Sequence, residues 1–423
     1  MLFRSGKTML TEALLYYTGA TTRLGKIEDG TTVSDFDEEE HRRGISLYTS
    51  VIPVLYKDLK LNLLDTPGYM DFIGEVISAM RVADCAVVLI DSVAGLEVGT
   101  EMAMQYAAQF NLPMIMVVNK MDRDNANFQK AIASVEEGTD YRLIPMQLPW
   151  GEKANFQGVI DLVSMKAYKG DGKTVVDIPE EYKAQADEAR LKLVEAAAEG
   201  EDALLERYFE NGGLSDEEIL QGMRKAIGTS NVIPVLVAAG AHMIGIGPLL
   251  DALVALAPSP LDRPAAVAQS PQGEVKLEPS DTGPLAAYVW KTTADPFVGR
   301  QTFFRVYSGA MVSDSRVWNA NKGEEERIAS VQVPFGKENL PVPAIHSGDI
   351  GTVAKLAVTT TGDTLTTREQ NLILPKPSYP NPLYRVAVAP KTQSDAAKMS
   401  STLTRLCEED LTLSWEMEPA TKQ

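Results

Sequence analysis

The sequence predicts an α/β domain with a mostly parallel, doubly wound sheet, then an antiparallel β-barrel, then the beginning of an α+β domain. Three observations support this prediction. Strand-sized apolar runs alternate with helical patterns as far as about residue 260, as in α/β domains. Short alternating runs separated by Gly, Asp and Asn turns follow over 283–374, which is typical of barrels. Finally, 375–423 has one helical pattern between two strand patterns.

The composition limits the possible classes of protein. The chain has 423 residues, 44% of them hydrophobic and 23% charged, which suits several soluble domains. No run approaches the roughly 18 apolar residues of a membrane helix, so we expect no membrane contact. Cys85 and Cys407 are far apart in the sequence, which favours a reducing cytoplasm over a disulfide framework, and no zinc-ligand spacing is present. A net charge of −18 argues against a broad basic face for nucleic acid. We expect a cytoplasmic monomer.

The first motif is Ser5-Gly6-Lys7-Thr8, the second half of a phosphate-binding loop of the form G-x-x-x-x-G-K-[ST]. In such a loop the backbone N–H groups cradle phosphates, Lys reaches their oxygens and the hydroxyl holds Mg²⁺. A helical pattern over 8–18 follows, so its N-terminus would point at phosphate. The first glycine of the loop would fall at Met1, with no strand before it. The tripeptide could therefore be a chance match, and we expect residues 1–5 to be a junction and not native sequence.

The second motif, LNLLDTPGYMDF at 61–72, ends a strand on a carboxylate. We expect Asp65 to hold Mg²⁺ through water, and the Gly68 N–H to sense the γ-phosphate. Upstream, the acidic run 35–40 is expected to be a solvated face. Ser46 directly precedes the strand pattern 48–56 and would offer its hydroxyl to Mg²⁺.

The third motif is Asn119-Lys120-Met121-Asp122, after a buried strand. Asp122 can accept hydrogen bonds from N1–H and the exocyclic amine of guanine, which adenine does not offer. We expect Asn119 to tie neighbouring loops together and Lys120 to lie along the base. Other expected elements of this domain are strands over 60–64, 85–91, 113–118 and 232–238, and helices over 71–83, 101–110, 178–209 (one or two) and 249–256.

The motifs SGKT, RRGIS, DTPGYMDF and NKMD resemble those of translational GTPases, and the chain from Gly6 onward resembles elongation factor G, particularly its elongation-factor-G-like branch. The resemblance implies a P-loop GTPase domain over 1–260 with a family-type insert at about 150–230. It implies binding of GTP or GDP with Mg²⁺, and the ribosome as partner of the complete protein. Ala239 and Gly240 align with the family's Ser-Ala pair at guanine, where we expect their backbone N–H groups to serve.

The same resemblance organises the rest of the chain. The Pro- and Ser-rich stretch 261–282 reads as a linker, 283–374 resembles the second domain, and 375–423 the start of a ferredoxin-like third domain. In that last part we expect strands over 384–389 and 413–418 around a helix over 395–409. The family's remaining domains are absent, so we expect a chain truncated at both ends.

Three departures from the family affect the chemistry. Tyr69 stands where the family has the His that orients the attacking water, and a phenol is a poor base, so we expect slow hydrolysis. Ser46 replaces the switch Thr and keeps its hydroxyl. The missing first strand would expose apolar surface, so we expect low stability.

Three functions stay open. The leading one is a GTPase that couples hydrolysis to translocation or ribosome recycling, with Lys7, Gly68 and Tyr69 at the reacting phosphate. A second is a regulatory ribosome-binding module that depends on GTP and hardly hydrolyses it, which Tyr69 favours. A third is an inactive fragment of such a factor.

Overall fold

The computed structural model describes residues 5–229, 231–295 and 299–417. The chain divides into two compact units. The first comprises Met1–Asp71 and Ala83–Ser259, and the second comprises Phe72–Val82 and Pro260–Gln423. The junction expected at residues 1–5 lies, except for Ser5, outside the described residues. Within the described ranges, no helix has the length and apolar character needed to cross a membrane.

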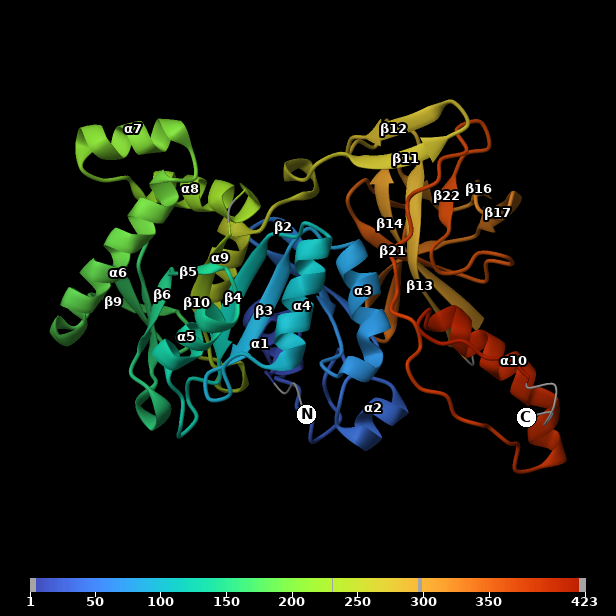
Figure 1. Cartoon of the computed structure of the whole chain (residues 1–423), viewed down its shortest axis with the longest axis horizontal. Coiled ribbons are helices and arrows are strands. Elements are labelled where there is room, and N and C mark those ends of the chain that lie inside the picture. Colours follow the sequence, from blue (N-terminus) through green and yellow to red (C-terminus); the bar gives the residue numbers. More distant parts are fainter. Residues whose placement is uncertain (1–4, 230, 296–298, 418–423) are drawn as a thin grey trace. The chain divides into compact units, whose positions relative to one another are not determined.

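A four-stranded parallel sheet forms the centre of the first unit, as predicted (Figure 1). Its strands run in the order β3-β4-β10-β5. The two inner strands are continuous apolar runs and are buried at every residue, because a parallel sheet is covered on both faces. The strands are β3 (Ala86–Asp91), β4 (Met114–Asn119), β5 (Arg142–Pro145) and β10 (Val232–Val237). The helices of this layer are α1 (Lys7–Tyr17), α4 (Val98–Gln109), α5 (Phe128–Gly138) and α9 (Ile246–Leu256).

A separate two-stranded sheet carries the second motif. Strand β1 (Ser50–Tyr56) pairs antiparallel with β2 (Leu59–Asp65), from Ser50 opposite Asp65 to Tyr56 opposite Leu59. Lys57 and Asp58 both adopt positive φ, as a tight two-residue hairpin turn requires. In the part of the chain that the structure describes, β2 and β3 belong to different sheets. The missing first strand is expected in the middle of the parallel sheet.

The predicted insert folds into a small antiparallel sheet and three helices. The segment 178–209, predicted to hold one or two helices, contains α6 and most of α7. Their separation follows from Gly200, where a Cβ would lie 2.3 Å from the Gly222 carbonyl oxygen, so the turn must stay small. The elements are β6 (Gln147–Trp150), β7 (Gly158–Asp161), β8 (Lys166–Lys169), β9 (Thr174–Val176), α6 (Glu180–Ala198), α7 (Asp202–Asn211) and α8 (Asp216–Thr229).

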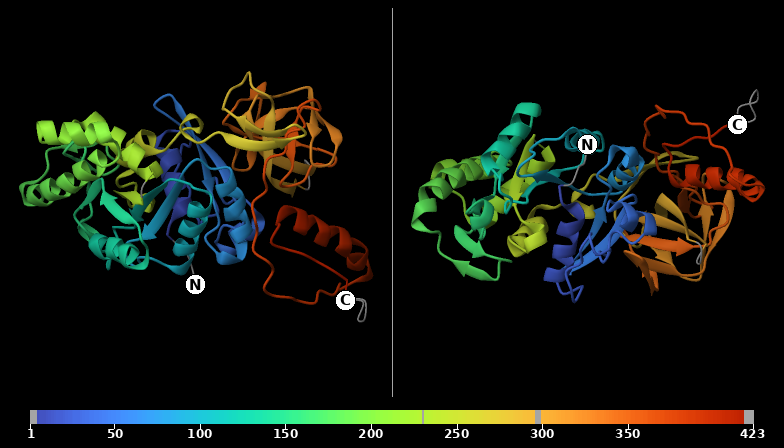
Figure 2. Two further views of the ribbon diagram at one scale, coloured as in Figure 1. Left: turned by 45° about the horizontal axis from the view of Figure 1, so that its top comes forward. Right: turned by 90° about the horizontal axis from the view of Figure 1, so that it is seen from below.

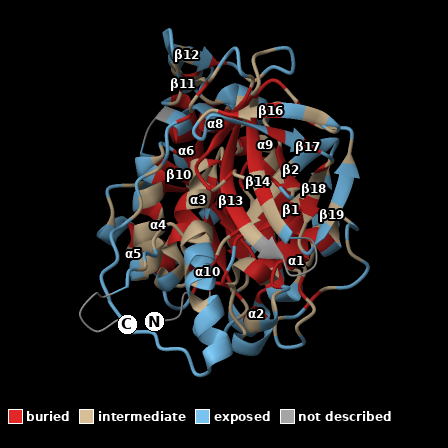
Figure 3. Ribbon diagram, turned by 90° about the vertical axis from the view of Figure 1, so that its right-hand side faces the viewer, coloured by how far each residue is buried: buried red, intermediate tan, exposed pale blue. Residues whose placement is uncertain are grey.

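The second unit contains a curled antiparallel sheet of eight strands in the order β17-β16-β22-β13-β14-β21-β18-β19. Its core is apolar and fully buried, with Val289, Phe304 and Leu365 at its centre. Strand β19 at the sheet edge is largely exposed (Figure 3). The strands are β13 (Ala286–Asp295), β14 (Gly299–Ser308), β16 (Ser315–Asn319), β17 (Glu324–Ile328), β18 (Val331–Phe335), β19 (Glu338–Val342), β21 (Ile350–Ala354) and β22 (Thr364–Thr366), with β15 (Met311–Val312) and β20 (Ala344–Ile345) paired separately.

Helix α3 (Ile73–Arg81), which follows the second motif, packs on this sheet within the second unit. Lys291 Nζ lies 2.8 Å from Glu75 Oε2 in an almost fully buried ion pair. Arg81 Nη1 donates to the Tyr307 hydroxyl at 2.7 Å, and its guanidinium lies over the Tyr288 ring. Helix α3 is therefore anchored to the barrel.

The segment 261–282, predicted to be a linker, contains a hairpin. Strands β11 (Ala266–Ser270) and β12 (Gly273–Leu277) form a hairpin. The Pro and Gly residues read as linker signals are here the turn, and Gly273 takes a φ of +119°. Gln269 also exchanges backbone hydrogen bonds with Ile373, which fastens the hairpin to the segment that follows β22.

The last segment keeps its helix but not its strands. Helix α10 (Gln393–Glu409) forms where a helix is predicted, with Thr392 and Asp395 as a capping box. Residues 384–389 and 413–417 adopt no strand, and residue 418 lies outside the described residues. An irregular stretch runs beside the helix instead (Figure 2). A strand is stable only when its backbone has a pairing partner, which these stretches lack within the described ranges.

Candidate functional site

The N-terminus of helix α1 is built around Gly6. Gly6 has a φ of +90°, and a Cβ on it would lie 2.7 Å from Asn119 Nδ2. Both facts require glycine here. Gly6 precedes the helix without a side-chain cap, so the first backbone N–H groups of the helix remain open to an anion.

Asn119 connects three segments that are far apart in the sequence. Its Nδ2 donates to the Ser5 carbonyl oxygen at 2.9 Å, and its Oδ1 accepts from the Gly240 N–H at 3.1 Å. The side chain is only 2% exposed. The phosphate-loop residues, the NKMD loop and the loop after β10 therefore meet at one side chain.

Lys7 is half-buried and lies near acidic side chains. Burial lowers the pKa of the Lys7 ammonium, while Asp65 and Asp35 oppose this by attraction. A cation at an open helix N-terminus suits an anionic ligand.

Thr8, Ser46 and Asp65 lie together, as three groups from three elements. The Thr8 and Ser46 hydroxyl oxygens are 3.3 Å apart. Asp65 is 6% exposed, burial raises the pKa of its carboxyl, and its Oδ2 is a buried oxygen without a hydrogen-bond partner. No cluster of three or more His, Cys, Asp or Glu residues suited to a metal ion occurs in the described ranges. Two hydroxyls and an unpartnered carboxylate oxygen fit a hard cation that keeps several waters, as Mg²⁺ does.

The acidic run 35–40, expected to be a solvated face, is partly buried. Asp35 is 5% exposed, and burial together with the nearby Asp65 raises its pKa to about 7. Glu40 is 2% exposed and accepts from the backbone N–H groups of Leu47 and Phe36. A buried carboxylate that accepts backbone N–H groups orders the loop around it. Nothing in a charge run distinguishes such residues from exposed ones, so the sequence could not identify them.

Lys120 has a positive φ of 63° and pairs with a residue that the sequence analysis did not single out. Its Nζ lies 2.7 Å from Asp91 Oδ2, and both side chains are largely buried. The Ser92 hydroxyl donates to the Lys120 carbonyl oxygen at 2.8 Å. Asp91 ends β3, so the ends of two neighbouring parallel strands are joined here.

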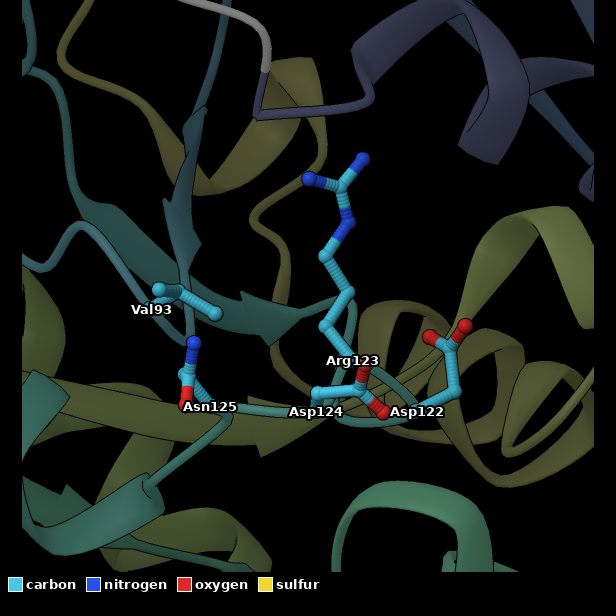
Figure 4. Close-up of a pocket in the computed structure, with 5 residues that line it drawn as sticks. All are labelled: Val93, Asp122, Arg123, Asp124 and Asn125. Atoms are coloured by element: carbon cyan, nitrogen blue, oxygen red, sulfur yellow. The ribbon is translucent and has the colours of Figure 1, made fainter.

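Asp122 borders a cavity of about 400 Å³, lined also by Val93, Arg123, Asp124 and Asn125 (Figure 4). In Figure 4 the Asp122 carboxylate lies on the opposite side of Arg123 from Val93 and Asn125. The depression is open to solvent, and four of its five lining residues are polar or charged. His242, which the motifs did not reveal, lies with its Nδ1 2.9 Å from Asp122 Oδ2.

The loop after β10 differs from the expectation for Ala239 and Gly240. The Ala239 N–H donates to the Ile244 carbonyl oxygen at 3.0 Å, and the Gly240 N–H donates to Asn119. Both N–H groups are thus already used inside the protein. A side chain at Gly240 would be a tight fit, since a Cβ would lie 3.1 Å from the Leu10 Cα.

Gly68 and Tyr69 lie in the irregular loop between β2 and the short helix Met70–Phe72. Both are half-buried. They follow Asp65 directly, so the loop begins at the cation-type cluster of Thr8, Ser46 and Asp65 and ends where α3 begins.

Comparison with known proteins gives three consecutive family matches. Residues 3–259 match the elongation factor Tu GTP binding domain, residues 284–368 match elongation factor G domain 2, and residues 379–423 match elongation factor G domain III.

The fold is also similar to a solved structure. A protein from Thermus thermophilus is 31% identical to this chain, with a TM-score of 0.88 over 99% of it. The match covers 61% of the Thermus protein, so this chain spans less than two thirds of that relative's length. The phosphate-type loop, the NKMD loop joined to it through Asn119, and the order of the three matched domains show that this chain belongs to the elongation-factor-G-like translational GTPases.

Proposed function

We propose that this chain binds GTP and GDP with Mg²⁺ and hydrolyses GTP slowly, and that the complete protein couples this cycle to a ribosomal step such as translocation or recycling. The observation that supports this most is the pair of hydrogen bonds from Asn119 to Ser5 and Gly240. They bring a phosphate-type loop and a base-type loop into one site, which two unrelated motifs would not do.

At the phosphate end, Ser5, Gly6, Lys7 and Thr8 are the proposed ligands. The backbone N–H groups at the open N-terminus of α1 would cradle the phosphate oxygens. Lys7 would pair with them, which compensates the burial that lowers its pKa in the nucleotide-free protein.

The cluster of Thr8, Ser46 and Asp65 would hold Mg²⁺ beside the terminal phosphates. When bound, the ion neutralises charge that develops on the transferring phosphoryl group. Asp65 would orient a metal-bound water through its unpartnered Oδ2, and the two hydroxyls would supply oxygen ligands.

At the base end, Asp122 would accept the two guanine donors and reject adenine by leaving its oxygens unpaired. Lys120, anchored by Asp91, would present its aliphatic stem to the base. Ala239 and Gly240 would shape the loop around the base instead of donating their engaged N–H groups.

For hydrolysis, the Gly68 N–H would sense the γ-phosphate and Tyr69 would lie by the attacking water. A phenol can position water by a hydrogen bond but accepts its proton poorly, so the chemical step would rely on Lys7 and positioning.

A second candidate function is a GTP-dependent ribosome-binding module that hardly hydrolyses the nucleotide. Tyr69 at the position of the family His favours it. The two candidates share every binding residue and differ only in the rate of the chemical step.

Equilibrium binding of a ribose-labelled fluorescent GDP tests nucleotide recognition. We expect GTP and GDP to compete and ATP not to compete. Competition by ATP as strong as by GTP, or no binding at all, would contradict the proposal.

Single-turnover GTP hydrolysis, with and without ribosomes, separates the two functions. We expect slow hydrolysis that Tyr69→His accelerates. Tight binding with no ribosome-stimulated turnover in either variant would favour the binding module.

A further inference from the structure

His242 contacts Asp122, the carboxylate that reads guanine in the proposed function. Its Nδ1 lies 2.9 Å from Asp122 Oδ2, within hydrogen-bond distance. The Asp122 side chain is 23% exposed, whereas that of His242 is 65% exposed. The imidazole is therefore the more solvent-exposed partner of the pair.

The backbone around His242 is fixed by hydrogen bonds within its loop and to Asn119. His242 ends the short helix Gly240–His242, and Ala239 and Ile244 exchange two hydrogen bonds across it, at 3.0 and 3.2 Å. The Gly240 N–H is bound to Asn119, and Gly240 packs against Leu10. The loop cannot move away without breaking these contacts, so only the His242 side chain can leave Asp122.

The chemistry of the pair resembles the chemistry of the proposed ligand. A ring N–H of neutral or protonated imidazole donates to a carboxylate oxygen, as the N1–H and the amine of guanine do. Guanine would need both Asp122 oxygens, and His242 already holds one of them. The two donors therefore compete for Oδ2.

We propose that His242 is a base-competing residue, which takes the place of guanine on Asp122 in the nucleotide-free protein and must swing away before a guanine nucleotide can bind. The proposal rests on the proposed function, since it needs Asp122 to be the base-reading group. His242 thus reduces the fraction of the protein that is ready to bind, and with it the apparent association rate.

The expected effect of losing this contact on nucleotide binding follows from the solvent exposure of His242 and Asp122. An ion pair with one well-exposed partner contributes modestly, which corresponds to a factor of about two to five in an equilibrium constant. Because the contact exists only in the free protein, its loss should speed association and leave dissociation unchanged.

Stopped-flow binding of the ribose-labelled fluorescent GDP to the full chain measures both rates. His242→Ala should raise the association rate about two- to fivefold with the same dissociation rate. His242→Asn should stay close to the unsubstituted protein, because an Asn amide nitrogen lies where Nδ1 does. His346→Ala is the matched control, since His346 Nδ1 lies 2.8 Å from Asp281 Oδ2 with 66% exposure, but on the barrel. It should change neither rate.

The outcomes distinguish this proposal from the function on which it rests. If the unsubstituted chain binds no guanine nucleotide, the proposed function fails. If it binds and His242→Ala leaves the association rate unchanged, the base-competing role is wrong. A faster dissociation in His242→Ala would also overturn it, because His242 would then contact the bound nucleotide.

Discussion

The loops joined by Asn119 and the segment 376–392 differ in what holds their backbone. Around Asn119, one buried side chain fastens Ser5 and Gly240, which lie more than a hundred positions away on either side of it. In 376–392 the backbone is neither helix nor strand, and Leu383 and Tyr384 are 100% and 83% exposed.

The difference shows that apolar side chains do not order a chain by themselves. Val386 and Val388 alternate as in a strand, yet both remain exposed. Val117 and Val235 are no more apolar, but each lies between hydrogen-bonded neighbours in the parallel sheet and is fully buried. In these two segments, backbone pairing and burial are present together in one and absent together in the other.

Removing the Asn119 side chain should have the largest effect. Asn119→Ala leaves the Ser5 carbonyl and the Gly240 N–H buried without partners, at a cost of about 1–3 kcal/mol each. We expect the affinity for GDP, measured by fluorescence titration, to fall at least about thirtyfold, since 1.4 kcal/mol is a factor of ten.

Asn319→Ala provides the matched control for this substitution. Asn319 is equally buried and donates to Thr359 and Asp363, but within the barrel. It should lower stability and leave GDP affinity within about twofold, as expected for a distant independent site. Equal losses of affinity in both variants would mean that Asn119 acts only through general stability.

The next effect is a gain of stability. Burial raises the pKa of Asp65, so its charged form is the disfavoured one in the folded, nucleotide-free protein. Asp65→Asn should therefore raise the nucleotide-free unfolding free energy. Thermal unfolding measures this, and titration with Mg²⁺ should show that GDP binding no longer depends on the ion.

Asp281→Asn is the control, because the pKa of Asp281 is shifted in the opposite direction from that of Asp65. The Ser347 N–H and His346 hold the pKa of Asp281 below its usual range, so its charged form is favoured and neutralisation should not stabilise. A Tm that rises as much in Asp281→Asn as in Asp65→Asn would argue against a buried charge as the cause.

A smaller effect is expected at the cap of α10. The Thr392 hydroxyl accepts from the Asp395 N–H and donates to its carboxylate. Thr392→Ala should cost about 1 kcal/mol of helix stability, visible as faster amide exchange over 393–397. Ser401→Ala, in the exposed middle of the same helix, should leave exchange in that first turn unchanged. An equal acceleration in both variants would contradict the capping role.

The smallest effect is expected in the exposed stretch. Val386→Thr should change the unfolding free energy by less than about 0.5 kcal/mol, because an exposed side chain loses no packing. Val117→Thr, on buried β4, should cost several times more. A loss at Val386 as large as at Val117 would show that this stretch is packed in solution.

Much of the site could be predicted from local pattern. The glycine, lysine and threonine of residues 6–8, the carboxylate at the end of β2 and the NKMD loop each have a residue type and position that follow from strand ends and helix starts. The parallel sheet brings the carboxyl ends of β3 and β4 to one edge, whereas β2, which ends on Asp65, belongs to a separate sheet. The barrel follows from its alternating runs and turns.

The rest depended on partners distant in the sequence. The roles of Asp91, His242 and Glu40 come from contacts that no local spacing encodes, and a charge run is the same whether it faces water or backbone N–H groups.

The hairpin of 266–277 and the unpaired stretch 384–389 both show that strand pairing depends on distant partners. The sequence predicts a linker at 266–277, where the structure has two paired strands. It predicts a strand over 384–389, which has no pairing partner within the described ranges. The sequence by itself determined which residues can form a helix start, a strand or a turn, because these depend on near neighbours. Only the tertiary structure decided which polar groups are buried and which strands pair, because the free energy of burial and hydrogen bonding depends on the partner that the fold supplies.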